Sequence, residues 1–272
     1  AGAALERLHA FALVHDDVVD DSATRRGAVT AHVDAIDRHQ RHGWRGEGRR
    51  FGEGVAILVG DLAHVYADRL LGTVPPATAA VWAELRTEVN MGQYLDLLGT
   101  VRGDRDRALA HRIARYKSGK YTIERPLHMG ATLAGAGDRA TAALSGYGDP
   151  LGEAFQLRDD VLGAFGDPEV TGKPVGEDLH EGKPTPLLAV ACERASAAEA
   201  ALLDRVGEPG LTDDDVARIQ QVLVTTGALD EVERLVEALT TRAVAALAEA
   251  RLAPEATREL TDLAYFVATR DR

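Results

Sequence analysis

The chain has 272 residues, 45% hydrophobic and 27% charged, a composition typical of a folded protein long enough to bury a sizeable core. Its 43 acidic residues outnumber its 31 basic residues, and the formal charge of -12 disfavours nucleic acid and anionic lipid as partners. The single cysteine, Cys192, excludes an internal disulfide framework and favours a reducing compartment, which predicts a cytoplasmic protein.

No apolar run reaches the roughly 18 residues of a membrane span, so stable insertion into a membrane is not expected. The first nine residues already have the pattern of an amphipathic helix and lack the charged-then-apolar order of a signal peptide. We therefore expect the chain to open inside a folded element.

Apolar residues recur at helical spacing along the chain, whereas strand signals are scarce. Breaks at glycine and proline predict helices over residues 1–21, 31–42, 52–72, 77–99, 106–134, 139–165, 184–204, 212–225, 228–251 and 254–269. Pro126 should kink the fifth of these helices. Thr212, followed by Asp215 three residues later, predicts a capping box at the start of the eighth. The expected fold is all-α, one domain over residues 1–272 with about ten helices.

The first unusual segment, residues 13–27, is rich in aspartate and ends in two arginines and a glycine. Asp16 and Asp20 stand at i and i+4 of the first predicted helix, so their carboxylates project from one face. Asp17 and Asp21 form a second pair about 100° around the helix. Like charges at this spacing destabilise a helix, and a hard divalent cation would compensate them. The alternative is a solvated acidic patch, which the apolar residues before Asp16 disfavour.

A second acidic pair, Asp159 and Asp160, follows another helical apolar run. A loop rich in glycine and proline comes next, and its lysines, Lys173 and Lys183, are placed to approach a phosphate held by metal ions. Two acidic clusters at helix ends, each followed closely by Arg or Lys, indicate a metal and diphosphate site far more specifically than one cluster does.

These motifs, in this order, resemble those of the trans-type isoprenyl diphosphate synthases, or polyprenyl synthetases, and most closely the bacterial geranylgeranyl diphosphate synthases. The resemblance is carried by Asp-Asp-x-x-Asp and Arg-Arg-Gly at residues 16–27, Phe-Gln-x-x-Asp-Asp at 155–160 and Gly-Lys-Pro-x-Gly-x-Asp at 172–178. Supporting segments are Gly-Asp at 60–61, Gly-Gln-Tyr-Leu-Asp at 92–96 and Tyr-Lys-Ser-Gly-Lys-Tyr-Thr at 116–122. The match spans essentially the whole chain.

The resemblance implies a helical bundle around a deep apolar cavity, with the two aspartate motifs facing each other across its mouth. It implies a magnesium-dependent transferase that condenses isopentenyl diphosphate with allylic diphosphates to a trans-prenyl diphosphate. It also implies a homodimer, for which the helix over residues 77–99 is a candidate interface. Such chemistry needs cations that stabilise the leaving diphosphate and a dry cavity that protects the carbocation.

The resemblance also implies roles for individual residues. The expected magnesium ligands are Asp16, Asp20 and Asp159, with Asp17 and Asp160 as further ligands or their partners. The residues expected to hold the allylic diphosphate are Arg25, Lys117 and Lys173, and Arg26 is expected to hold the diphosphate of isopentenyl diphosphate. Further expected substrate contacts are Gln93, Ser118, Gln156 and Lys183. A structural role is the alternative for Gln93, Asp61, Asp96 and Lys120.

Product length is expected to depend on residues one and two helical turns before Asp16, because a chain growing away from the metal ions would run along that helix. Phe11 is bulky and its neighbour Ala12 is small, a pattern that resembles geranylgeranyl diphosphate synthases. Ordinary core packing is the competing interpretation of Phe11.

The sequence departs from the family pattern in two places. The chain starts after the place where the family has a Gly-Gly-Lys-x-x-Arg segment that binds isopentenyl diphosphate, and we expect truncation rather than an incomplete site. Gly163 stands where a third aspartate would complete the second motif, and Asp167 is a candidate substitute.

Two alternative functions are a class I terpene cyclase and a non-catalytic partner subunit of a prenyl synthase. Cyclases of this kind usually carry an Asn-Asp type second motif, so Asp159-Asp160 with its Gly-Lys-Pro loop favours the synthase. The intact aspartates of both motifs argue against a subunit that only binds.

Overall fold

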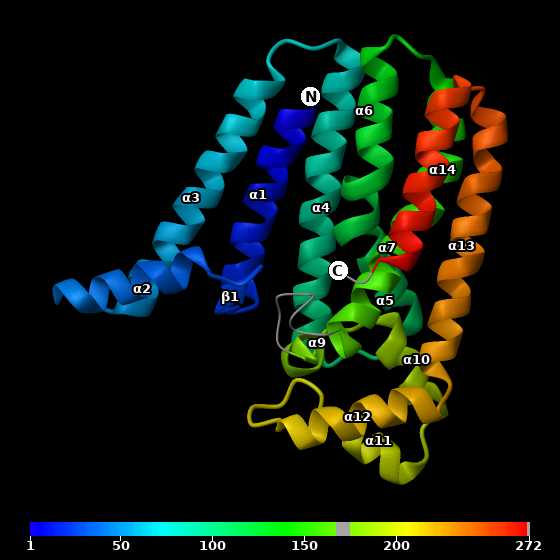
Figure 1. Cartoon of the computed structure of the whole chain (residues 1–272). Coiled ribbons are helices and arrows are strands. Elements are labelled where there is room, and N and C mark those ends of the chain that lie inside the picture. Colours follow the sequence, from blue (N-terminus) through cyan, green and yellow to red (C-terminus); the bar gives the residue numbers. More distant parts are fainter. Residues whose placement is uncertain (167–174, 271–272) are drawn as a thin grey trace. The chain divides into compact units, whose positions relative to one another are not determined.

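The computed structural model describes residues 1–166 and 175–270, and nearly all of its regular structure is helical, which confirms the predicted all-α class (Figure 1). The chain divides into two compact units, with the boundary between Val74 and Pro75.

The first unit contains three helices, α1 (Gly2–Val19), α2 (Ala31–His42) and α3 (Gly48–Leu71). Helices α1 and α3 lie along each other (Figure 1). Small residues allow this close approach, because a Cβ atom on Gly60 of α3 would lie 2.2 Å from the ring of His15 on α1. Ala4 and Leu8 of α1 and Ala56 of α3 are fully buried.

A short antiparallel hairpin, β1 (Thr24–Arg25) and β2 (Ala28–Val29), follows α1. Its two-residue turn has positive φ at both positions, 53° at Arg26 and 74° at Gly27, as a type I′ turn requires. The turn explains why a glycine follows the two arginines. Strands of two residues are too short to give an alternating pattern, so the sequence did not predict them.

The second unit contains the long helices α4 (Pro76–Arg102), α7 (Asp138–Phe165), α13 (Ala228–Ala250) and α14 (Pro254–Thr269). Its shorter elements are α5 (Arg107–Ile113), η1 (Ala114–Glu124), α6 (Arg125–Leu133), α9 (Glu177–Glu181), α10 (Pro186–Arg194), α11 (Ala197–Leu203) and α12 (Asp213–Thr225). Helix α7 lies along α13, and α12, with α11 beside it, crosses one end of this unit (Figure 1).

The predicted helix over residues 106–134 is three successive segments, and the middle one, η1, is a π-helix. Its backbone lies directly on two neighbours. A Cβ on Gly92 of α4 would lie 2.2 Å from the backbone nitrogen of Lys117, and a Cβ on Gly152 of α7 would lie 2.6 Å from the Cα of Gly119. Pro126 falls in the first turn of α6, where its missing N–H is best tolerated.

Helix caps explain two other boundaries. The predicted capping box of Thr212 and Asp215 is confirmed at the start of α12. The single helix predicted over 184–204 is wrong, because Ser196 forms a capping box with Glu199 and starts a new helix, α11.

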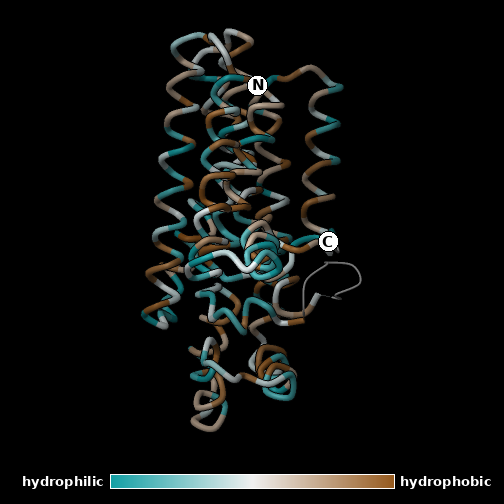
Figure 2. The backbone as a smooth tube through the Cα atoms, turned by 90° about the vertical axis from the view of Figure 1, so that its left-hand side faces the viewer, coloured by the Kyte–Doolittle hydropathy of each residue, from teal (hydrophilic) through white to brown (hydrophobic). Residues whose placement is uncertain are grey.

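Hydrophilic and hydrophobic stretches alternate along the helices (Figure 2). Among the described residues, no helix combines the length and the apolar character needed to cross a membrane.

Candidate active site

The first aspartate motif lies at the end of α1. The backbone N–H of Asp20 donates to the carbonyl of Asp16 at 2.8 Å, so the two residues share one helical turn. Asp21 leaves the helix with a φ of 55°, and the predicted pairing of Asp17 with Asp21 is therefore wrong. The carboxylate of Asp21 lies instead 3.6 Å from Arg49.

Arg25 supplies the positive charge that offsets this acidic cluster. Its Nε donates to Oδ1 of the buried Asp17, and its Nη2 lies 3.7 Å from Oδ2 of Asp16. Burial raises the pKa of Asp17 above its ordinary value, and the hydrogen bond from Arg25 acts in the opposite direction. The hairpin explains this placement, because its tight turn folds the chain back at the end of α1. Arg26 is exposed in the turn.

An aromatic cluster precedes the motif on the α1–α3 contact. The ring of Phe11 stacks on His64 with centroids 4.8 Å apart and tilts against His15 at 4.7 Å. Nε2 of His15 lies 3.1 Å from the carbonyl oxygen of Ile57 and 3.6 Å from a carboxylate oxygen of Asp61. Asp61, on α3, therefore contacts His15 of α1, and Phe11 packs within the first unit. Ala12 is half-buried on α1.

The second aspartate motif lies near the end of α7. The Asp159 side chain is 55% exposed, and its Oδ1 lies 2.9 Å from Nη2 of Arg270. Asp160 is 5% exposed and accepts a hydrogen bond of 2.7 Å from Nε2 of Gln156. Burial raises the pKa of Asp160 well above its ordinary value, and the neighbouring charge of Asp178 raises it further.

Arg270 was not predicted as part of this site. Its guanidinium lies over the ring of Phe155 at 3.9 Å and donates to the backbone carbonyl of the same residue at 3.3 Å. A lone arginine 111 residues beyond Asp159 has no local pattern that would mark it.

Lys117 lies on η1 and points to α4, where its Nζ is 2.5 Å from Oδ2 of the buried Asp96. The close contact of Gly92 with the η1 backbone sets this pairing, because any larger residue would separate the two helices. Gln93 and Ser118, on the same two helices, are half-buried.

Lys183 follows α9 and lies 3.4 Å from Oδ1 of Asp178 and 2.6 Å from Oε2 of Glu181. The other predicted lysine, Lys173, lies outside the described residues, and so does Asp167.

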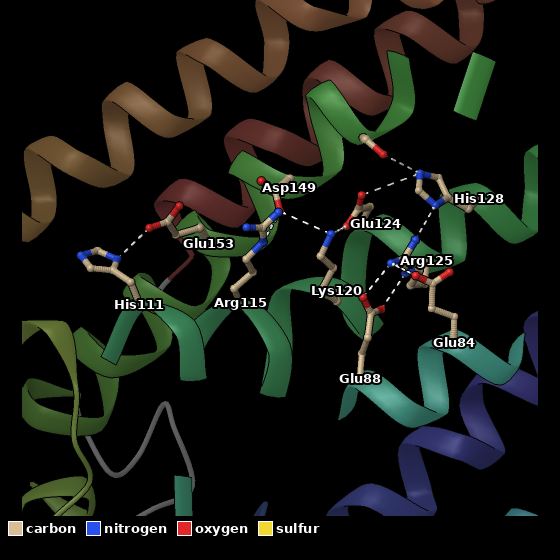
Figure 3. Close-up of polar contacts among 11 residues, drawn as sticks. Glu84, Glu88, His111, Arg115, Lys120, Glu124, Arg125, His128, Asp149 and Glu153 are labelled. Carbon is tan, nitrogen blue, oxygen red and sulfur yellow. Dashed lines mark hydrogen bonds and ion pairs between the residues drawn. The ribbon is translucent and has the colours of Figure 1, made fainter. Parts of the chain in front are cut away.

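The second unit also holds a buried ion-pair network that joins α4, η1, α6 and α7 (Figure 3). Lys120 donates to Glu124, and both Nε and Nη2 of Arg125 donate to Glu88 at 2.6 Å. His128 lies 3.2 Å from Nη1 of Arg125 and 3.0 Å from the hydroxyl of Ser145. Burial would raise the pKa of Glu124, but hydrogen bonds from Lys120 and Ser145 bring it below its ordinary value. These contacts fit a structural role for Lys120, which the sequence left open as the alternative to ligand contact.

Each aspartate motif supplies donors that fit magnesium. In the described parts of the chain, no three His, Cys, Asp or Glu side chains come together as a complete metal cage. Magnesium does not require one, since it commonly binds through one or two carboxylates, water and substrate phosphate oxygens. The carboxylates of Asp16, Asp20 and Asp159 are hard oxygen donors of this kind.

Comparisons with known proteins agree with this architecture. The polyprenyl synthetase family model matches residues 1–224. The chain is 35% identical to a geranylfarnesyl diphosphate synthase of Aeropyrum pernix, over 85% of this chain and 69% of the relative. It is 36% identical to a geranylgeranyl diphosphate synthase of Mycobacterium tuberculosis, over 93% of this chain and 69% of that protein.

A solved geranylgeranyl pyrophosphate synthase of Corynebacterium glutamicum, complexed with isoprenyl diphosphate and magnesium, superposes with a TM-score of 0.94. It is 40% identical, and the match covers 98% of this chain and 77% of that one. The chain belongs to the polyprenyl synthetase family. The predicted family, trans-prenyltransferase class and magnesium cofactor are thereby confirmed.

Proposed function

We propose that the protein condenses isopentenyl diphosphate with an allylic prenyl diphosphate and that its product is geranylgeranyl diphosphate. The observation that carries the proposal is the pair of aspartate motifs at the ends of α1 and α7, each with a cationic side chain on its carboxylates. Family membership supports the reaction type.

Asp16, Asp20 and Asp159 are proposed as the magnesium ligands. When bound, magnesium would stabilise the negative charge that develops on the leaving diphosphate. Arg25, Lys117, Lys173 and Lys183 are proposed to bind that diphosphate through charge-assisted hydrogen bonds, and Arg26 to bind isopentenyl diphosphate.

The proposed reaction needs no nucleophile from the protein. The allylic carbon–oxygen bond breaks, the double bond of isopentenyl diphosphate attacks the resulting carbocation, and a proton passes to the departing diphosphate. Gln93, Ser118 and Gln156 are proposed to orient the reacting groups. Fixed cationic side chains favour the charge-separated transition state because they need no reorganisation.

The product length is a proposal that similarity alone does not decide, since the relatives include both geranylfarnesyl and geranylgeranyl diphosphate synthases. The bulk of Phe11 beside the small Ala12 supports a chain of intermediate length. Phe11→Ala should lengthen the product and Ala12→Phe should shorten it towards farnesyl diphosphate. If neither substitution changed the product distribution, the residues that set product length would lie elsewhere.

The proposed function is tested by incubating the protein with magnesium, isopentenyl diphosphate and each allylic diphosphate, followed by product identification by mass. Geranylgeranyl diphosphate is the expected product. A cyclised hydrocarbon formed without consumption of isopentenyl diphosphate would refute the synthase and identify a cyclase. If the protein formed neither a prenyl diphosphate nor a cyclised hydrocarbon, the proposed chemistry would be refuted.

We also propose that the protein is a homodimer and is located in the cytoplasm. Helix α4 leaves Met91, Tyr94, Leu97 and Val101 exposed at helical spacing, which supports an interface on this helix. The single cysteine supports a reducing compartment. Sedimentation that detected only a monomer at micromolar concentration would refute the dimer.

A further inference from the structure

The turn between α2 and α3, with the helix ends on both sides of it, concentrates positive charge in a chain that is acidic as a whole. Residues 38–51, the basic patch, contain one acidic residue and five exposed arginines, Arg38, Arg41, Arg45, Arg49 and Arg50. Five positive charges and one negative charge give the basic patch a formal charge of +4, against -12 for the whole chain. Because salt screens distant charges more than near ones, the basic patch can attract an anionic surface that the whole chain would repel.

Three of these arginines form ion pairs that leave them accessible. Their side chains are 60% or 62% exposed, and exposed ion pairs of this kind are weak. The guanidinium donors therefore remain available to a phosphate group, which they bind through charge-assisted hydrogen bonds. Arg45 and Arg50 take no part in these pairs. The pairs are Arg38 with Asp34 at 3.5 Å, Arg41 with Asp37 at 2.8 Å and Arg49 with Glu53 at 2.7 Å.

An aromatic cluster fixes Trp44 within the basic patch. Gly43 ends α2 in the left-handed conformation, with a φ of 61°, and the backbone N–H of Trp44 donates to the carbonyl of His39 at 3.2 Å. The centroid of the Trp44 ring lies 5.0 Å from that of His42 and 5.3 Å from that of Phe51. Trp44 is nevertheless 45% exposed and Phe51 37% exposed. The fold thus holds two large aromatic side chains among the arginines with part of their surface open to solvent.

Arginine beside exposed tryptophan fits the surface of an anionic lipid bilayer. Arginine side chains near such a surface are attracted to its negative potential, and indole rings favour the boundary between headgroups and acyl chains. A nucleic acid fits less well, because a long polyanion would extend over the acidic surfaces of the chain as well. A bilayer meets only the face turned towards it, and screening limits repulsion from the other charges to about 10 Å at 0.1 M salt.

The basic patch also borders the first aspartate motif. Nη2 of Arg49 lies 3.6 Å from Oδ2 of Asp21, which follows the end of α1. A prenyl diphosphate combines a charged headgroup with a long apolar chain, so a bilayer beside the site would receive such a product favourably. This consequence rests on the proposed function, whereas binding to a bilayer does not.

We propose that residues 38–51 dock the protein on anionic lipid bilayers, with the arginines at the lipid phosphates and Trp44 at the level of the headgroups. The contact is peripheral and inserts no helix. It restricts the expectation from the charge of the whole chain, which disfavours anionic lipid, to the surfaces outside the basic patch.

The test measures co-sedimentation with vesicles of phosphatidylcholine alone and of equal parts phosphatidylcholine and phosphatidylglycerol. The protein should bind the mixed vesicles and not the neutral ones, and added salt should weaken the binding. Arg45→Ala combined with Arg50→Ala should weaken it by about 30-fold, since each arginine near an anionic bilayer contributes a factor of about 5. The matched control is Arg242→Ala combined with Arg258→Ala, which removes the same charge from exposed positions of α13 and α14 and should change binding far less.

Tryptophan fluorescence gives a second measurement. The chain has two tryptophans, and Trp82 is only 3% exposed. Mixed vesicles should therefore shift the emission to shorter wavelength through Trp44, and Trp44→Phe should remove the shift.

Three results would overturn the inference: equal binding to both kinds of vesicle, an unchanged emission, or equal losses in the two double variants. Binding of RNA through the same arginines, with no emission shift on vesicles, would overturn it in favour of a nucleic-acid interface. None of these measurements involves catalysis, so the proposed function depends on its own test.

Discussion

Substitution of Gly92 by alanine is predicted to disturb both the stability of the second unit and the position of Lys117. The added Cβ would lie 2.2 Å from the backbone nitrogen of Lys117, 2.4 Å from the carbonyl carbon of Tyr116 and 2.5 Å from the Cα of Lys117. These are backbone atoms, so no side-chain rotation relieves the contact. Helix α4 and η1 must separate, although the contact of Gly152 with Gly119 holds η1 on its other side.

The expected cost follows from two opposing effects. Overpacking a tight contact destabilises by about 1–3 kcal/mol, and the rigid neighbours of η1 favour the upper end of that range. Alanine returns up to about 1 kcal/mol through its higher helix propensity. A net loss of about 2 kcal/mol should lower the melting temperature by about 4–8 °C for a protein of this size. A catalytic group displaced by about 1 Å can cost about 100-fold in rate, so kcat/KM for the allylic diphosphate should fall by up to that factor.

Thermal unfolding followed by circular dichroism and steady-state kinetics would measure the two effects. Gly130→Ala is the matched control, because Gly130 lies within α6 and a Cβ there would meet nothing within 4 Å. That control should be stabilising by about 0.5–1 kcal/mol. A melting temperature and kcat/KM for Gly92→Ala equal to those of the wild type would refute the argument from the close contact.

Asp16→Ala and Asp159→Ala should each abolish product formation at saturating magnesium with little change in the melting temperature, because the loss of a weak ion pair is offset by the loss of repulsion between neighbouring carboxylates; near-normal product formation would refute the metal assignment. Lys120→Met should destabilise the fold by about 3–5 kcal/mol in urea titrations, since it removes the lysine that donates to the buried carboxylate of Glu124, and adding Glu124→Leu should recover most of the loss. Arg270→Gln should tighten Mg²⁺ binding up to about fivefold in calorimetry, because a partly exposed ion pair worth about 0.2–1 kcal/mol no longer competes for Asp159. Unchanged binding would show that the pair does not compete.

Helical periodicity and caps were sufficient to predict most of the fold. The helix starting after Thr212 was placed by its capping box. In the helix predicted over 228–251, Val232, Val236 and Leu239 recur at helical spacing and are buried. The break at Ser196 was also visible in the sequence, as a serine followed three residues later by a glutamate, but the apolar run around it masked the signal.

The features that sequence reasoning missed depend on contacts between distant residues. The pairing of Glu88 with Arg125 joins residues 37 positions apart, and that of Asp159 with Arg270 joins residues 111 apart. The space beside Gly163 is likewise filled by Asp178 of α9 and not by a neighbouring residue of α7. Local patterns predict where a helix runs, whereas such pairings depend on which helices the fold brings together.

Residues 114–124 form a π-helix, and the positions of its side chains depend on the number of residues in this stretch. Its hydrogen bonds span five residues instead of the four of an α-helix, so deletion of one residue would permit the more common α-helical pattern. A one-residue change of helical register turns the following side chains by about 100°. Deletion of Ala114 would thus leave a well-formed helix in which Lys117 no longer meets Asp96, so this segment should tolerate substitutions better than insertions or deletions.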